Sequence, residues 1–279
     1  MACVVAVVPV SAFWSSKRVG RGTNGVGAES LQPEIKQAAG GENYLQMAHL
    51  IGTLISHETN AQVPGDRYRE EDFIRQEIGS LMKEFGAEEC NVLPEFVAEV
   101  DGFVRLFQDR DRDLIVCALV DKRDVLEHMR AILRRDHMPE DLAYMALVES
   151  GFEQSSASQE GAAGFWQFTE ETARDYGMEV NDHVDERLDL SKSTEAASRY
   201  IRDLILEFGS GSSVMLAMAA YNSGPETVRR AVRSVKDPIK QRNFWYLYHV
   251  RALPEETRLY VPRVFAAILI GRNPKRFGF

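Results

Sequence analysis

The sequence predicts an all-α fold, and three observations carry this prediction. Apolar residues recur every three to four positions through most of the chain from residue 68 onward, as on one face of a helix. No stretch alternates apolar and polar residues as a half-buried strand does. No glycine-rich phosphate loop follows a strand, and no repeat of about 20–50 residues is visible. With 279 residues, 44% of them hydrophobic, the chain can bury a sizeable core.

Residues 1–66 are predicted to lie outside that core. The stretch "ACVVAVVPVSAFW" is apolar and ends in small residues before Phe13, which is typical of an export signal, but it lacks a positive n-region. Residues 15–43 are rich in Gly, Ser and charge and predict a disordered linker, and a short helix is expected over residues 44–55. Residues 1–16 are therefore a cleaved signal, an anchor or the product of a misplaced start codon.

Residues 67–135 predict a helical subdomain. Two apolar stripes at helical spacing run through it, the first from Phe73 to Phe85 before Gly86 and the second from Phe96 to Phe107. The pattern assigns no activity to this region, and docking of a protein partner is the role left open for it.

A glutamate closes the next apolar helix. Pro139 and the two acids after it predict the helix start, and Gly151 predicts its end. Counting back from Glu149, apolar residues lie three, four and seven positions earlier, so Glu149 is on the apolar face. A carboxylate there is either a paired core residue or a working acid.

Short helices are predicted for the rest of the chain, within a domain expected to span residues 136–279. They are expected over residues 169–177, 189–209, 212–224, 225–235 and 254–271. Thr169 is the predicted N-cap of the first, and Pro225 the first residue of the fourth. Pro262 lies inside the last, so a kink or a break is expected there.

Four motifs stand out against this helical background: "VESGF" from Val148, "GAAGFWQF" from Gly161, "AAYNSGP" from Ala219 and "LPEETRLYVP" from Leu253. In this order and at this spacing, they resemble the catalytic (SLT) domain of the family-1 lytic transglycosylases. The resemblance covers about residues 138–272. It implies a lysozyme-like helical domain that cleaves the MurNAc–GlcNAc β-1,4 bond of peptidoglycan without water, giving 1,6-anhydro-MurNAc ends.

In this resemblance Glu149 matches the single catalytic acid and base. The residues support that role independently, because a carboxyl group on an apolar face loses solvation and its pKa rises. The family comparison also assigns substrate-binding positions to Ser150, Ser158, Gln167, Phe168, Tyr221, Asn222, Glu256 and Tyr260. Each has a structural alternative: a buried polar group needs a partner, Asn222 also fits a helix C-cap, and Glu256 suits a first helical turn.

Two rival functions remain open. A goose-type lysozyme-like hydrolase needs a second carboxylate, for which Asp182, Asp185 and Asp189 are the candidates. A catalytically idle wall-binding or scaffold protein would need none of these groups.

The expected partner is the glycan strand of peptidoglycan, and the expected location is the periplasm or cell envelope of a bacterium. A net charge of −9 and a pI of about 5.3 argue against nucleic-acid binding. The histidines and cysteines lack ligand spacing, so neither a metal nor an organic cofactor is expected.

Overall fold

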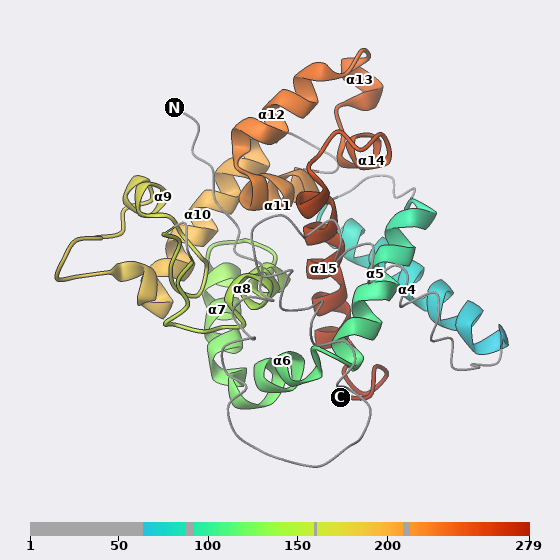
Figure 1. Ribbon diagram of the computed structural model, residues 1–279, viewed down its shortest axis with the longest axis horizontal. Coiled ribbons are helices and arrows are strands. Elements are labelled where there is room, and N and C mark those ends of the chain that lie inside the picture. Colours follow the sequence, from blue (N-terminus) through green and yellow to red (C-terminus); the bar gives the residue numbers. More distant parts are fainter. Residues whose placement is uncertain (1–63, 87–91, 159–160, 209–212) are drawn as a thin grey trace, which may run out of the picture. The chain divides into compact units, whose positions relative to one another are not determined.

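The computed structural model describes residues 64–86, 92–158, 161–208 and 213–279 (Figure 1). The segments expected to be an export signal, a linker and the helix at residues 44–55 lie outside these ranges. Within the described ranges helices dominate, and the β-type pairing is limited to isolated bridges, Ala157 with Ala163, Ala163 with Phe168 and Val180 with Asp185. The prediction of an all-α fold is confirmed.

The chain up to Glu149 forms helices joined by short connections. They are α4 (Pro64–Glu84), α5 (Pro94–Gln108), α6 (Arg112–Val116), the π-helix η1 (Cys117–Asp121), α7 (Arg123–Arg135), the 3₁₀-helix η2 (Glu140–Leu142) and α8 (Ala143–Ser150). The two predicted stripes are the inward faces of α4 and α5, since Ile74, Ile78, Phe96 and Phe107 are all fully buried.

The remaining helices are α9 (Glu170–Asp175), the 3₁₀-helix η3 (Glu186–Leu188), α10 (Leu190–Phe208), α11 (Ser213–Ser223), α12 (Pro225–Ser234), α13 (Pro238–Gln241), α14 (Phe244–His249) and α15 (Glu255–Arg272). The Thr169 side chain caps α9 by accepting from the Thr172 backbone N–H at 3.3 Å, and Pro225 opens α12, both as predicted. Helix α14 was not predicted; Asn243 caps it by accepting from the Tyr246 N–H at 2.9 Å.

Helix α15 is not broken at Pro262, which leaves a kink as the other form of the expectation. The helix runs from Glu255 to Arg272 with the proline inside it. Proline removes one intrahelical hydrogen bond and crowds the preceding turn. Burial compensates that loss, because α15 packs against α5, α8 and α11 and most of its second half is fully buried.

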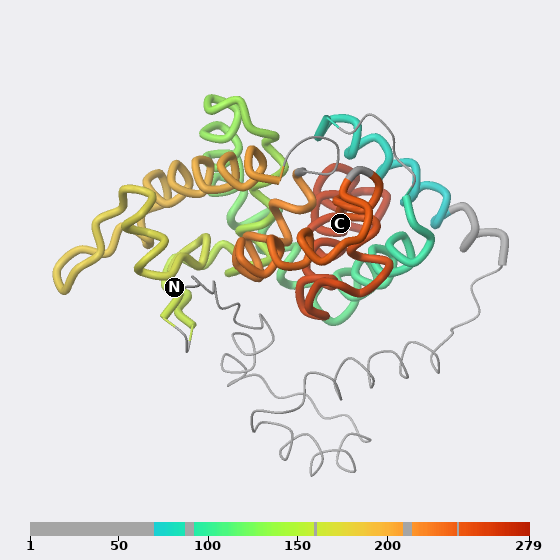
Figure 2. The backbone as a smooth tube through the Cα atoms, turned by 90° about the horizontal axis from the view of Figure 1, so that it is seen from above, coloured from blue at the N-terminus to red at the C-terminus, as the bar shows by residue number. Residues whose placement is uncertain are grey.

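Aromatic packing joins α5 to α14 and α15, and α15 runs side by side with α5 (Figure 1, Figure 2). The Phe96 ring lies 5.4 Å from the Phe265 ring of α15 and 5.9 Å from the Phe244 ring of α14, both edge-on. Edge-to-face pairs add to the free energy that burial alone supplies. Residues 71–279 accordingly belong to one compact unit with a continuous apolar core. The predicted boundary between residues 67–135 and 136–279 stays a prediction.

Ion pairs join the end of α4 to the end of α15 and to the segment just before α8. The Arg272 guanidinium donates to Glu84 at 2.9 Å and to Asp141 at 2.8 Å, and Arg130 donates to the other Asp141 oxygen at 2.7 Å. Asp141 is only 4% exposed, and a buried carboxylate is tolerated when it is paired in this way. The pairs therefore fix the start of the α8 region against α7 and the end of α15.

Candidate active site

Glu149 lies in the last turn of α8, where its carboxyl group is buried. Glu149 is 6% exposed, and its Oε1 atom has no hydrogen-bond partner among the described residues. Gly151 ends the helix in the left-handed conformation, with φ +65°, and its N–H donates to the Leu147 carbonyl at 2.9 Å. The sequence-based placement of Glu149 on the apolar face and of Gly151 at the helix end is confirmed.

The surroundings of Glu149 raise its pKa to about 7. Burial is the largest cause, because the charged form loses solvation, and the negative charge of Glu256 adds to the rise. The Tyr260 hydroxyl and the Arg263 guanidinium act in the opposite direction, since both stabilise the anion. A carboxyl group with this pKa can give up a proton and take one back near neutral pH.

Helix α15 brings three of these groups to Glu149. Glu256 is exposed in its first turn, Tyr260 is buried one turn later, and Arg263 follows three residues after that. This spacing of four and three residues places them on one helical face. The buried Tyr260 hydroxyl acts on the Glu149 carboxyl group but has no hydrogen bond of normal geometry to any described residue, so it can also bond to a ligand. Arg263 was missed in the sequence, although the same spacing could have indicated it.

Helix α11 contributes Tyr221 and Asn222. The Tyr221 hydroxyl donates to the Trp166 backbone carbonyl at 2.7 Å, so it holds the "WQF" segment against α11. Burial raises the pKa of Tyr221 well above its ordinary value, and the nearby Glu149 charge raises it further. Asn222 is 3% exposed, and its Nδ2 atom has no hydrogen-bond acceptor among the described residues. An unsatisfied buried amide is costly unless a ligand or water completes it.

Gln167 is held in a tight turn of the "GAAGFWQF" segment. Its backbone has φ +50°, and its Nε2 atom donates to the carbonyl oxygens of Ser156 at 3.2 Å and Gly164 at 2.8 Å. No described residue donates to its Oε1 atom. The side chain therefore braces the turn with its amide nitrogen and keeps an acceptor for another group.

Gly164 and Arg187 explain how that turn is held in place. A Cβ atom on Gly164 would lie 2.0 Å from the Arg187 carbonyl oxygen, and the residue has φ +80°, so only glycine fits. The buried Arg187 guanidinium donates to the backbone carbonyls of Gly161 at 2.7 Å and Phe168 at 3.1 Å, while Asp185 pairs with its other face at 2.7 Å. Sequence reasoning missed Arg187, because nothing in "DERLDL" indicates that this arginine turns inward.

The other predicted site residues lie in the same region but are engaged with the protein. The Ser150 hydroxyl is buried and within hydrogen-bond distance of the Phe165 carbonyl at 2.7 Å and the Ala146 carbonyl at 3.1 Å. Ser158 Oγ accepts from the Ala162 N–H at 2.9 Å and closes a turn. Phe168 packs its ring against Tyr221 and Tyr200, each at 6.2 Å. These three position the surrounding chain.

Two of the aspartates considered as a second carboxylate, Asp185 and Asp189, hold the local structure of residues 185–192. Both Asp185 oxygens accept from the Arg187 side chain, and this pairing lowers the pKa of Asp185. Asp189 Oδ1 accepts from the Lys192 backbone N–H at 2.8 Å, and Asp182 is exposed. The charges that act on Glu149 come instead from Glu256 and Arg263.

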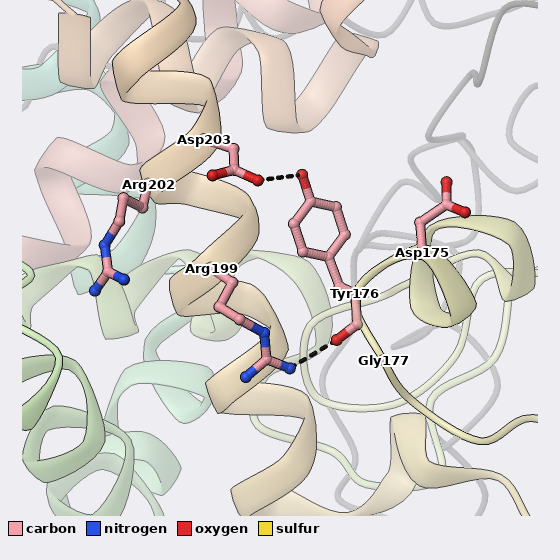
Figure 3. Close-up of a pocket in the computed structure, with 6 residues that line it drawn as sticks. All are labelled: Asp175, Tyr176, Gly177, Arg199, Arg202 and Asp203. Carbon is pink, nitrogen blue, oxygen red and sulfur yellow. Dashed lines mark hydrogen bonds between the residues drawn. The ribbon is translucent and has the colours of Figure 1, made fainter.

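A surface hollow of about 550 Å³ lies elsewhere, between α10 and the turn after α9 (Figure 3). Two hydrogen bonds join its lining residues: the Tyr176 hydroxyl donates to Asp203 at 3.1 Å, and Arg199 donates to the Tyr176 carbonyl at 2.6 Å. None of the predicted site residues lines it. We therefore centre the candidate site on Glu149.

Comparison with known proteins covers the same part of the chain. Residues 129–244 match the family model described as "Transglycosylase SLT domain". Membrane-bound lytic murein transglycosylase D from Escherichia coli K12, and the same protein from strain O6:H1, are 36% identical over 146 residues, 52% of this chain and 31% of the relative. A protein named for tributyltin chloride resistance, from Alteromonas sp. (strain M-1), is 32% identical over 105 residues, 38% of this chain and 50% of that protein.

The chain thus spans about a third of the length of the E. coli relatives that it matches. The matched family model begins in α7 and ends at Phe244, the first residue of α14, and includes Glu149, the "WQF" segment and the Tyr221–Asn222 pair. The motif resemblance, the helical fold and these matches agree that residues 129–244 are similar to the transglycosylase SLT domain.

Proposed function

We propose that this chain is a peptidoglycan lytic transglycosylase that cleaves the MurNAc–GlcNAc β-1,4 bond without water, with Glu149 as its single general acid and base. The observation that carries the proposal is the buried Glu149 carboxyl group, whose pKa is raised to about 7. The SLT family match and the name of the E. coli relatives support peptidoglycan as the substrate.

In the first step, protonated Glu149 gives its proton to the bridging oxygen as the C1–O bond breaks. The leaving sugar departs with that proton, and positive charge develops on the ring carbon C1. In the second step, the Glu149 carboxylate takes the proton of the C6 hydroxyl on the same sugar, and O6 bonds to C1. The proton balance closes, no water is consumed, and a 1,6-anhydro ring results.

The other groups act by position and charge. General acid catalysis contributes about 10²–10⁴-fold, so the remaining rate enhancement must come from orientation and electrostatics. We propose that the unpaired hydroxyl of Tyr260, the unpaired Nδ2 of Asn222 and the Oε1 of Gln167 bind sugar hydroxyl or N-acetyl groups. Tyr221, Ser150, Ser158 and Phe168 then act by holding the "WQF" segment, and Glu256 acts by keeping Glu149 protonated.

Location and partners follow from the same assignment. A peptidoglycan substrate and the membrane-bound E. coli relatives support a cell-envelope location, and export through the N-terminal segment would take the chain there. No helix within the described ranges combines the length and hydropathy needed to cross a membrane. We keep docking of a protein partner by residues 67–135 as a separate proposal.

Hydrolysis is the alternative reaction, because Glu256 is a second carboxylate whose negative charge raises the pKa of Glu149. Hydrolysis would use it to activate water, as inverting or retaining glycosidases do with their second carboxyl group. The experiment is digestion of purified sacculi followed by mass spectrometry of the released muropeptides. Anhydro products, each lighter by one water than the hydrolytic product, support transglycosylation. Hydrolysis-mass products alone contradict it, and no release by the wild-type protein favours an idle wall-binding protein.

A further inference from the structure

We propose that Lys122 is a positioning residue for Glu149, which it holds by binding the C-terminal end of α8 from outside the matched SLT region. The Lys122 ammonium donates to the backbone carbonyls of Gly151 at 3.2 Å and Phe152 at 3.0 Å. It also pairs with the Glu153 carboxylate at 2.6 Å. The inference rests on the proposed function, because it assigns Lys122 a role in that reaction.

A π-helix delivers Lys122 to this point. The residues Cys117–Asp121 form η1, and the Lys122 N–H closes its last turn by donating to the Cys117 carbonyl at 2.8 Å. A π-turn accommodates an extra residue and changes the direction of the side chains that follow, and such turns are frequent near functional sites. Lys122 is the residue at which this turn ends and α7 begins.

A second contact from the same segment reaches the same helix end. A Cβ atom on Gly151 would lie 2.9 Å from the Cδ1 atom of Leu114. Leu114 lies in α6 and is 4% exposed. The turn after Glu149 is therefore packed by Leu114 on one side and hydrogen-bonded by Lys122, so residues 114–122 fix where α8 ends.

Helix ends explain why a lysine suits this position. The last carbonyls of a helix lack intrahelical partners and carry a partial negative charge, which a cation at the C-terminus stabilises. The Lys122 side chain is 19% exposed and Glu153 29%, so the ion pair is partly shielded from solvent. Glu149 lies two residues before Gly151, and a displacement of about 1 Å in a catalytic group can cost ~100-fold in rate.

The test compares Lys122→Met with the wild-type full chain on sacculi and on soluble glycan fragments. Methionine keeps the apolar stem and removes the ammonium, so α8 loses the bonds at its end and Glu149 becomes better hydrated. We expect kcat to fall about 10- to 100-fold with KM nearly unchanged. Lys122→Arg, which keeps the charge and the donors, is expected to recover most of the rate.

The pH profile separates positioning from a direct charge effect. Tyr221, Tyr260, Glu256 and Arg263 still face Glu149 in the variant, so their influence is constant. Better hydration of Glu149 lowers its pKa and moves the alkaline limb of kcat to lower pH. Direct loss of a neighbouring positive charge would raise the pKa and move the limb upward. An upward or absent shift overturns the proposal, as does a wild-type kcat.

Two matched variants complete the experiment. Lys192→Met removes a surface lysine that pairs with Glu186 and should leave rate and pH profile unchanged. Glu153→Gln removes the ion pair but leaves the two carbonyl bonds, and its expected loss is under threefold. If Lys122→Met does not fold, Lys122→Gln at low temperature gives the same comparison. An inactive wild type would refute the proposed function, whereas an active wild type matched by its Lys122 variants refutes only this inference.

Discussion

The Tyr260 hydroxyl of α15 lies beside the Glu149 carboxyl group of α8, and both groups are buried with unpaired atoms. Neither Glu149 Oε1 nor the Tyr260 oxygen has a hydrogen bond of normal geometry within the described residues. The proximity nevertheless lowers the pKa of Glu149, while burial raises it. The pair thus combines an acid whose pKa is near neutral with a hydroxyl that favours the ionised form of that acid.

Tyr260→Phe is predicted to move the alkaline limb of kcat to higher pH. The hydroxyl favours the ionised form of Glu149, so its removal raises the Glu149 pKa above its wild-type value of about 7. A general acid must be protonated, so the active range extends upward. The pH–rate profile on soluble glycan strands checks this. Thermal stability should hardly change at pH 5, where Glu149 is protonated in both proteins, and a limb at lower pH would contradict the assignment.

Glu149→Gln is predicted to abolish lytic activity while the protein remains folded. Glutamine has nearly the same shape but can neither give nor take the proton, so a loss of at least ~10²–10⁴-fold is expected. Release of soluble material from sacculi measures the effect. Glu171→Gln, at an exposed glutamate of α9, is the matched control and should keep wild-type activity. Equal activity of the wild type and the Glu149 variant would remove Glu149 from the mechanism.

The same substitution is predicted to stabilise the fold at pH 8. Between pH 4.5 and about 7, folded Glu149 holds its proton while the unfolded chain has released it. Unfolding therefore releases a proton in that window, and the free energy of unfolding falls as the pH rises through it. The free energy of unfolding lost in this way is roughly 3 kcal/mol at most. The loss is complete above pH 7 and absent below pH 4.5. Urea denaturation of both proteins at pH 4, 6 and 8 should show this widening difference; a constant difference would contradict a raised pKa.

Gly164→Ala is predicted to destabilise the protein far more than Gly161→Ala. Both glycines have positive φ, +80° and +83°, so alanine costs each roughly 1 kcal/mol of backbone strain. At Gly164 the new Cβ would also meet the Arg187 carbonyl at 2.0 Å, whereas at Gly161 no atom of the described residues lies within 4 Å. We expect a further loss of ~2 kcal/mol or more at Gly164. Denaturant midpoints for the two variants give the comparison. Similar midpoints would contradict the prediction, because they would show that the backbone at Arg187 moves away from residue 164 at little cost.

Local signals predicted the ends of several elements correctly. Gly151 at the end of α8, Thr169 at the start of α9 and Pro225 at the start of α12 all lie where the residue types indicated. Each depends on the backbone preference or hydrogen bonding of a single residue, which the neighbouring sequence determines. Pro262 shows the limit of this reasoning, since the burial of α15 kept the helix intact there.

The candidate site was only partly predictable. Glu149, Tyr221, Asn222 and Tyr260 could be chosen from their motifs, and the structure brings Tyr260 to Glu149 and Tyr221 from another helix. The sequence could not show which of these residues hold the backbone and which keep polar atoms for a ligand. Gln167 and Ser150 donate to backbone carbonyls. Arg187 and Lys122 hold the site from segments that show no distinguishing pattern.

The sequence by itself determined that the chain is helical, that Glu149 faces inward at a helix end, and that the SLT motifs occur in order. Such properties follow from residue spacing and local backbone preference. Tertiary structure alone decided that burial raises the pKa of Glu149 and that Tyr260, Glu256 and Arg263 act on the same carboxyl group. It also decided that Lys122 secures the end of α8. Desolvation and charge–charge interaction depend on distances between residues far apart in the chain, and only the packing of the helices fixes those distances.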